Sequence, residues 1–212
     1  MKDYYAERAP VYDRVYHYPE RQADLRSLEA YLSSAFDGRD VLEVAAGTGY
    51  WTHFLSLSAR SITATDSSPE TLRLLQQRRI QCPLTVKVSD AHTLEGVQTS
   101  FSGAFAGLWF SHVPRQQHAI WLRTLTAKLK PGATVILLDN TTAQCQRLPI
   151  TETDAEGNTY QTRVTDAGNS YRIMKNFPTE ADLREASLGV ASNPRYQTFE
   201  HFWLYEFTCS GS

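Results

Sequence analysis

"VLEVAAGTGYWTHFL", residues 41–55, is the stretch that decides the fold. A short apolar run surrounds Glu43, a turn containing Gly47 and Gly49 follows, and apolar side chains then recur at helical spacing. Strand, turn and helix in this order are typical of the first unit of a doubly wound α/β sheet. Glycines in such a turn allow the backbone to approach a ligand closely, because no side chain stands in the way.

The same alternation continues on both sides of this stretch. Apolar runs predict further strands at 61–66, 83–90, 103–111 and 133–139, with helices at 20–36, 67–79 and 114–130. In the last of these helices we expect Ile120, Leu122, Leu125 and Leu129 to face inward. Strands that alternate with helices predict parallel pairing, with crossover helices on both faces of the sheet.

The pattern changes after residue 140. A polar hairpin is predicted over 157–177, a short helix over 178–189, and two closing strands within 195–209. The expected fold is α/β: a doubly wound, mostly parallel seven-stranded sheet with helices on both faces. We find no internal repeat or linker, so residues 1–212 are expected to form one domain, with 1–36 as a helical cap and 141–177 as a hairpin lid.

Composition excludes several classes of function. The formal net charge of −2 and the absence of a dense basic block argue against nucleic acid as a partner. The three cysteines are far apart, which favours neither a disulfide framework nor a metal site. No run approaches the ~20 apolar residues of a membrane span, and the first residues lack the apolar core of a signal peptide. We therefore expect a cytoplasmic monomer or homodimer that binds a small molecule and no membrane.

Acidic residues stand in or after three successive strands. Glu43, Asp66 and Asp90 suit a ligand that presents an amine, a ribose diol and an exocyclic amine. A dinucleotide-binding turn would carry a third glycine where Thr52 stands, which weakens the case for NAD. Asp66 has an alternative role as the cap of the following helix.

Five motifs then resemble one known family. They are VLEVAAGTGYWT, ATDSS, VSDAHTL, GLWFSHVP and LKPGATVILLD, which occur in the order found in class I S-adenosylmethionine-dependent methyltransferases, over about residues 1–140. The chain departs from the usual pattern where Ala45 replaces a first glycine and Ala46 replaces a frequent cysteine, both by small residues. The resemblance implies a Rossmann-like fold, methyl transfer and S-adenosyl-L-methionine as cofactor.

The resemblance also implies roles for matched positions. Gly47, Gly49 and Ala45 would surround the methionine part of the cofactor, and Glu43 would orient the turn or meet the cationic end of the cofactor through water. The remaining expected cofactor contacts are Tyr12, Asp66, Ser67, Asp90, Ala91, Phe110 and Ser111.

Two residues are candidates for chemistry on the substrate. His112, just past the fourth predicted strand, could act as a general base or equally cap a helix, and Asn140 could position a polar group or cap a turn. Tyr5 and four residues of the hairpin are weaker candidates for substrate contact: Tyr160, Tyr171, Arg172 and Lys175. The two cations among them suggest an anionic or carboxylate-bearing substrate.

The expected function is direct in-line methyl transfer to a small-molecule metabolite. One alternative keeps the cofactor and attacks another carbon of the sulfonium, giving cyclisation or aminocarboxypropyl transfer with release of methylthioadenosine. More remote alternatives are an NAD-dependent dehydrogenase and a non-catalytic binding protein on the same scaffold.

Overall fold

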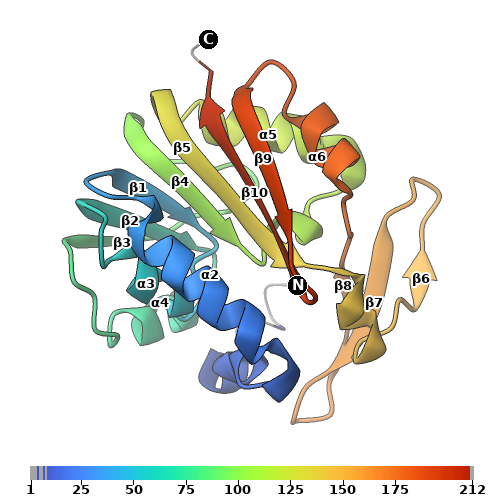
Figure 1. The fold of residues 1–212 in the computed structure, drawn as a ribbon. Coiled ribbons are helices and arrows are strands. Elements are labelled where there is room, and N and C mark those ends of the chain that lie inside the picture. The colour runs from blue at the N-terminus through green and yellow to red at the C-terminus, as the bar shows by residue number, and fades with distance from the viewer. Residues whose placement is uncertain (1–3, 5–6, 8, 211–212) are drawn as a thin grey trace.

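A seven-stranded sheet forms the centre of the molecule in the computed structural model, which describes Tyr4, Glu7 and residues 9–210. Its strands are β1 (Asp40–Val44), β2 (Ser61–Asp66), β3 (Leu84–Val88), β4 (Phe101–Gly107), β5 (Leu129–Asn140), β9 (Ala191–Thr198) and β10 (Phe202–Cys209). They lie in the order β3-β2-β1-β4-β5-β10-β9, and only β10 runs antiparallel to its neighbours (Figure 1). This confirms the predicted mostly parallel, doubly wound sheet.

Helices cover both faces of this sheet (Figure 1). The α-helices are α2 (Gln22–Ala35), α3 (Tyr50–Leu55), α4 (Pro69–Leu75), α5 (His118–Thr126) and α6 (Glu180–Ala186). Short 3-10 helices are η1 (Ala9–Tyr16), η2 (Pro19–Arg21), η3 (Phe110–His112), η4 (Arg115–Gln117) and η5 (Thr142–Gln146). Apolar residues of α2, α3 and α4 pack on one face and those of α5 and α6 on the other. Because helices alternate with strands along the chain, they cover and bury both faces of the parallel sheet.

The helix over α5 is shorter than the sequence predicts, because residues 115–117 form the 3-10 turn η4 and β5 already begins at Leu129. Its inward face consists of Trp121, Leu122 and Leu125, all buried, whereas Ile120 is 56% exposed. The inward orientation predicted for Ile120 is therefore wrong: the helical phase gives the core position to Trp121 instead.

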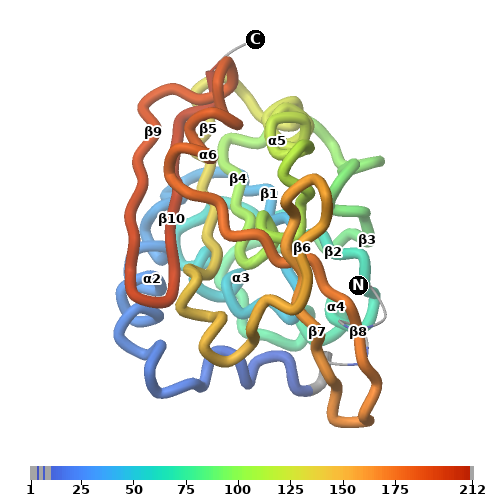
Figure 2. Tube along the Cα trace, turned by 90° about the vertical axis from the view of Figure 1, so that its right-hand side faces the viewer, coloured from blue at the N-terminus to red at the C-terminus, as the bar shows by residue number. Residues whose placement is uncertain are grey.

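A second, three-stranded sheet forms the region predicted as a hairpin. β7 (Thr159–Val164) and β8 (Ser170–Met174) are that hairpin, and β6 (Glu152–Thr153) adds a short edge strand that the sequence did not indicate. Figure 2 shows β7 and β8 as a hairpin at one side of the molecule, at the end where the parallel strands of the main sheet finish in Figure 1. The backbone N–H of Asn176 donates to the carbonyl of Ser111 at 2.8 Å, which ties the chain after β8 to η3.

Strand order reverses between β1 and β4, which are adjacent although they are far apart in the chain. Ligands of doubly wound sheets bind outside the carboxyl ends of the strands at such a point. The turn over residues 45–49 lies there. No helix among the described residues combines the length and the apolar character needed to cross a bilayer.

Candidate functional site

Two cavities meet at the carboxyl ends of the strands. The first, called the strand-end cavity, has a volume of about 160 Å³ and is lined by the loops after β1, β2, β3 and β4. The second, called the polar cavity, has a volume of about 290 Å³ and extends toward β7, η2 and η5. Tyr12, Leu108 and His112 line both. A site with two adjoining compartments can hold two molecules in contact.

The turn after β1 presents bare backbone to the strand-end cavity. Ala45 and Gly47 have left-handed φ values of 55° and 56°, and a Cβ added at Gly47 would meet no atom within 4 Å. A left-handed alanine costs about 1–3 kcal/mol, and such strain is typical of functional sites. Gly49 also lies at positive φ, but a Cβ there would approach Leu75 Cγ to 2.7 Å. Gly49 thus permits close packing of the turn on α4 and does not line this cavity.

Asp66 connects two of the loops that line the strand-end cavity. Its carboxylate accepts hydrogen bonds from the backbone N–H groups of Gly47 and Ser68, each at 2.9 Å. The α4 cap is Ser68, whose Oγ accepts from Thr71 N, so the alternative role of Asp66 as helix cap does not apply. Burial raises the pKa of Asp66, and the two backbone donors oppose that rise. Asp66 and its neighbour Ser67 both line the cavity.

Glu43 lies beneath the same turn and is 2% exposed. With Tyr12, Ala45 and Gly47 it borders a small recess beside the strand-end cavity. Burial raises its pKa to about 8, and the nearby Asp66 carboxylate adds to the rise. Its Oε2 atom is buried without a hydrogen-bond partner among the described residues. A buried polar atom in this state is costly unless a hydrogen-bond partner reaches it.

The loops after β3 and β4 form the opposite wall. Asp90 is exposed and accepts from the backbone N–H of His92 at 2.7 Å, and Ala91 lines the cavity beside it. His92 and Trp109, which the sequence did not single out, meet edge to face at 4.9 Å between ring centres. Thr71, Gly107 and Leu108 complete the lining that was missed.

Phe110 and Ser111 were predicted to contact the cofactor, but they do not line the strand-end cavity. β4 ends at Gly107, so the backbone that borders the cavity is that of residues 107–109, and the next residues turn inward as η3. Phe110 packs in the core against His118 and Trp121. Ser111 is fully buried.

The 3-10 helix η1, which precedes α2, borders the site beside the turn of residues 45–49. Tyr12 lines both cavities. The adjacent Asp13 anchors it: its carboxylate accepts from Thr48 Oγ1 at 2.6 Å and forms an ion pair with Arg78. Arg78 also donates to the carbonyl of Thr48 at 2.5 Å, so the anchor holds the glycine-containing turn itself. Tyr5 lies outside the described residues.

His112 is 5% exposed and stands where the two cavities join. Its Nδ1 lies 2.5 Å from the carbonyl of Met174, so Nδ1 carries the proton and Nε2 has the lone pair. Burial, together with the positive charges of Lys175 and Arg163, lowers the pKa of His112 to about 3. The imidazole is therefore neutral at physiological pH and able to accept a proton.

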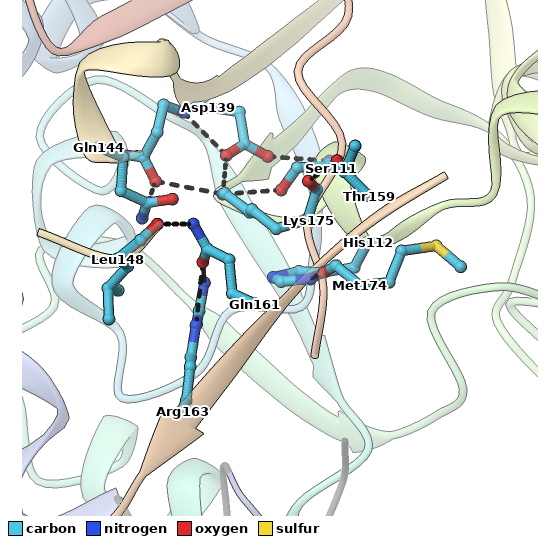
Figure 3. A network of polar contacts seen from close by, with 11 residues as sticks. Ser111, His112, Asp139, Gln144, Leu148, Thr159, Gln161, Arg163, Met174 and Lys175 are labelled. Carbon is cyan, nitrogen blue, oxygen red and sulfur yellow. Dashed lines mark hydrogen bonds and ion pairs between the residues drawn. The ribbon is translucent and has the colours of Figure 1, made fainter. Parts of the chain in front are cut away.

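A buried polar network lies behind His112 (Figure 3). Lys175 Nζ donates to Asp139 Oδ1 at 2.6 Å, to Ser111 Oγ at 2.8 Å and to Asn140 Oδ1 at 3.1 Å. Burial lowers the pKa of Lys175 while Asp139 opposes that change; Lys175 in turn keeps the pKa of Asp139 below its usual value despite burial. With three acceptors, Lys175 has its three N–H groups occupied.

Asn140 is the residue of this network that can still donate a hydrogen bond to a ligand. Its Oδ1 accepts from Lys175 and, at 2.9 Å, from Gln144 Nε2. Its Nδ2 is buried and has no hydrogen-bond partner among the described residues, and Asn140 lines the polar cavity. The arrangement leaves an amide donor for an acceptor atom inside that cavity.

Three of the predicted substrate contacts in the hairpin do not line either cavity. Tyr160 donates to Asp154 at 2.9 Å, and Arg172 lies 3.3 Å from the Tyr160 ring centre while paired with Glu152. Tyr171 donates to Glu7 at 2.8 Å and so joins the hairpin to the N-terminal segment. Of the hairpin candidates, Lys175 is the one that lines the polar cavity.

The cations that do line the polar cavity are mostly ones that the sequence did not indicate: Arg21, Arg147 and Arg163, besides Lys175. They come from η2, from the residue after η5 and from β7. Each resembles an ordinary surface arginine in sequence, and no motif could have singled them out.

Comparison with known proteins agrees with this geometry. Residues 41–132 match a family described as a methyltransferase domain. A solved structure titled as a DhpI–SAM–HEP complex is 26% identical, covers 97% of this chain and 94% of its own, and superposes with a TM-score of 0.78. DhpI in complex with SAH gives 24% identity, coverage of 99% and 95%, and the same TM-score of 0.78.

A more distant structure shares the fold alone. The N-methyltransferase NodS from Bradyrhizobium japonicum WM9, in complex with S-adenosyl-L-homocysteine, is 13% identical, with coverage of 99% and 98% and a TM-score of 0.69. No curated protein sequence matches the chain.

Proposed function

We propose that the chain is a class I S-adenosylmethionine-dependent methyltransferase, in keeping with the methyltransferase domain that residues 41–132 match, and that it transfers a methyl group directly to a small-molecule metabolite. The observation that carries this proposal is the pair of cavities that meet at Tyr12, Leu108 and His112. The strand-end cavity would take the cofactor, and the polar cavity would take the acceptor. An acceptor compartment of about 290 Å³ suits a metabolite and not a macromolecule.

The residues of the strand-end cavity fit S-adenosylmethionine. The buried Glu43 Oε2, which has no hydrogen-bond partner among the described residues, provides a hydrogen-bonding atom near the turn for the cofactor. The carboxylate of Asp66, which has lone pairs beyond those used by Gly47 and Ser68, is suited to ribose hydroxyls. Asp90, Ala91 and Ser67 would border the adenine, and Ala45, Gly47 and Tyr12 the methionine part.

The protein contributes orientation and proton transfer. When bound, S-adenosylmethionine supplies a methyl group that its sulfonium makes electrophilic. The chain must hold the acceptor atom in line, at ~3–3.5 Å, and exclude water. Tyr12 and Leu108 would enclose the point of transfer. His112 would take the proton that a hydroxyl or amine loses, on Nε2, while Asn140 Nδ2 orients the acceptor.

The identity of the by-product tests this proposal. The purified protein, incubated with S-adenosylmethionine and fractions of a metabolite extract, is expected to accumulate S-adenosylhomocysteine above a control without extract, measured by mass spectrometry. Release of methylthioadenosine in its place would overturn methyl transfer in favour of cyclisation or aminocarboxypropyl transfer. Boiled protein serves as the control for spontaneous breakdown of the cofactor.

A further inference from the structure

Basic side chains outnumber acidic ones in the lining of the polar cavity. Four of its lining residues are basic and one, Asp166, is acidic. Asp166 is exposed and paired with Arg14, and Arg147 is paired at the surface with Glu20 at 2.6 Å. Lys175 is balanced by Asp139. Arg21, which also lines the cavity, has no ion pair with the residues that the structure describes.

Arg21 is the least satisfied of these cations. It is 5% exposed, its Nε is buried without a partner, and its side chain forms no hydrogen bond or ion pair with the residues that the structure describes. Its guanidinium instead contacts the rings of Tyr18 and Phe202, at 5.1 Å and 5.8 Å from their centres. Aromatic faces attract a cation but accept none of its N–H groups in plane, so the five-donor fork remains available.

The other arginines converge on the same space. Arg147 lies 4.3 Å from the centre of the Tyr18 ring, which Arg21 also contacts. Arg163 is 7% exposed and is held by the uncharged side-chain oxygen of Gln161, at 2.8 Å and 3.2 Å (Figure 3). Gln161 is in turn fixed by donating to the carbonyl of Leu148 at 2.5 Å. Like charges that converge on one cavity repel one another unless an anion joins them.

We propose that the polar cavity is an anion-binding subsite, and that the acceptor substrate carries a carboxylate or phosphoryl group held there by Arg21 with Arg147 and Arg163. Guanidinium groups match both anions through paired hydrogen bonds, which a lysine cannot reproduce. The unpartnered amide of Asn140 adds an uncharged donor to the same cavity. That the anion belongs to the acceptor rests on the proposed function; the anion subsite itself does not.

The subsite gives the substrate a defined direction. With its anionic end among the arginines, the other end of the molecule would reach the junction at Tyr12, Leu108 and His112. The anion would also offset the positive charges of Lys175 and Arg163 that act on His112, and so make the imidazole a better base. A metabolite with an anion at one end and a hydroxyl or amine at the other satisfies both compartments.

Binding of inorganic phosphate, followed by 31P NMR at constant ionic strength, tests the subsite in the full-length protein. Phosphate is expected to bind the wild type, and Arg21→Gln to weaken that binding at least about tenfold, because a charge-assisted contact is lost. Arg147→Gln, at an exposed position that tolerates change, should weaken it by a smaller factor. Arg184→Gln is the matched control, since Arg184 pairs with Glu180 on the surface of α6 and lines neither cavity.

Two further measurements separate the outcomes. Acetate added in competition distinguishes a carboxylate preference from a phosphoryl preference: strong displacement of phosphate indicates the former. Calorimetry with S-adenosylhomocysteine shows whether each variant is folded with an intact cofactor site. A wild type that binds S-adenosylhomocysteine but binds no phosphate and no acetate would overturn the anion subsite. Equal phosphate affinities in all variants would overturn it as well. Both results would leave the proposed function standing. Phosphate binding without S-adenosylhomocysteine binding would do the reverse.

Discussion

Lys175→Met is expected to lower the free energy of unfolding by about 3–5 kcal/mol. Lys175 is 1% exposed and forms an ion pair at 2.6 Å with Asp139, which is fully buried. Removing the ammonium leaves a buried carboxylate with only the backbone donors of Ser111 and Asn140. An uncompensated buried charge costs far more than the pair contributes, because desolvation is no longer offset.

Urea unfolding followed by circular dichroism measures this effect. The control is Arg195→Met, which removes an exposed cation that pairs with the partly buried Glu206 and should cost less than about 1 kcal/mol. The double variant Lys175→Met, Asp139→Asn should recover part of the loss, since it removes the buried charge as well. A loss below about 1 kcal/mol for Lys175→Met would show that this pair does not hold the hairpin segment to the sheet.

His112→Gln is expected to reduce kcat by about 10²–10⁴-fold, the usual contribution of a positioned general base. Glutamine keeps a polar side chain of similar reach but cannot accept the proton of a hydroxyl or amine. The affinity for S-adenosylhomocysteine should change little, because His112 is proposed to act on the acceptor. The rate is followed as S-adenosylhomocysteine release with an acceptor identified from the metabolite fractions.

The lowered pKa of His112 determines the pH dependence expected of the wild type. The pKa of His112 is lowered to about 3 by burial and by its cationic neighbours, so the neutral form persists down to about pH 4. The kcat/KM profile of the wild type should therefore show no fall near pH 6.5, where an ordinary histidine takes up a proton. His53→Gln, at a position that lines neither cavity, is the control. A His112→Gln enzyme with kcat within threefold of the wild type would exclude the proposed role.

Local sequence determined the sheet and the turn at its switch point. Strand, turn and helix signals in residues 41–55 are contained within the stretch itself, and the parallel order follows from the alternation that surrounds it. For the same reason Ala45, Gly47, Asp66, Ser67, Asp90 and Ala91 were placed together correctly at the strand-end cavity. The identity of their ligand is part of the proposed function.

The polar cavity could not be predicted, because it depends on the register of a hairpin and on segments distant in sequence. Arg163 pairs with Tyr171 across β7 and β8, whereas Arg172 pairs with Thr162, one position further along the ladder. Adjacent positions on a strand face opposite ways, so Arg163 is buried and Arg172 is exposed. Sequence alone shows two arginines in a polar hairpin and does not tell which faces inward.

The predicted position of Phe110 and Ser111 at the cavity also depended on a feature that local sequence does not determine, the end of a strand. Their placement assumed that the fourth strand extends to residue 111, but β4 ends at Gly107 and Leu108 takes a left-handed φ of 58°. The cavity wall consequently ends at Trp109, and the following residues turn into the core. Strand ends depend on tertiary packing, which the apolar run did not reveal.

Isothermal calorimetry with S-adenosylmethionine, S-adenosylhomocysteine and NAD, on the wild type and on Asp66→Ala, tests the central proposal most directly. The wild type is expected to bind one equivalent of either adenosyl compound and no NAD. Asp66→Ala should bind them about 10–100-fold more weakly, since a charged hydrogen-bond acceptor is lost. Asp37→Ala, at an exposed turn position, should leave both affinities unchanged. Binding of NAD, or failure of the wild type to bind either adenosyl compound, would contradict the proposed cofactor and with it the proposed methyl transfer.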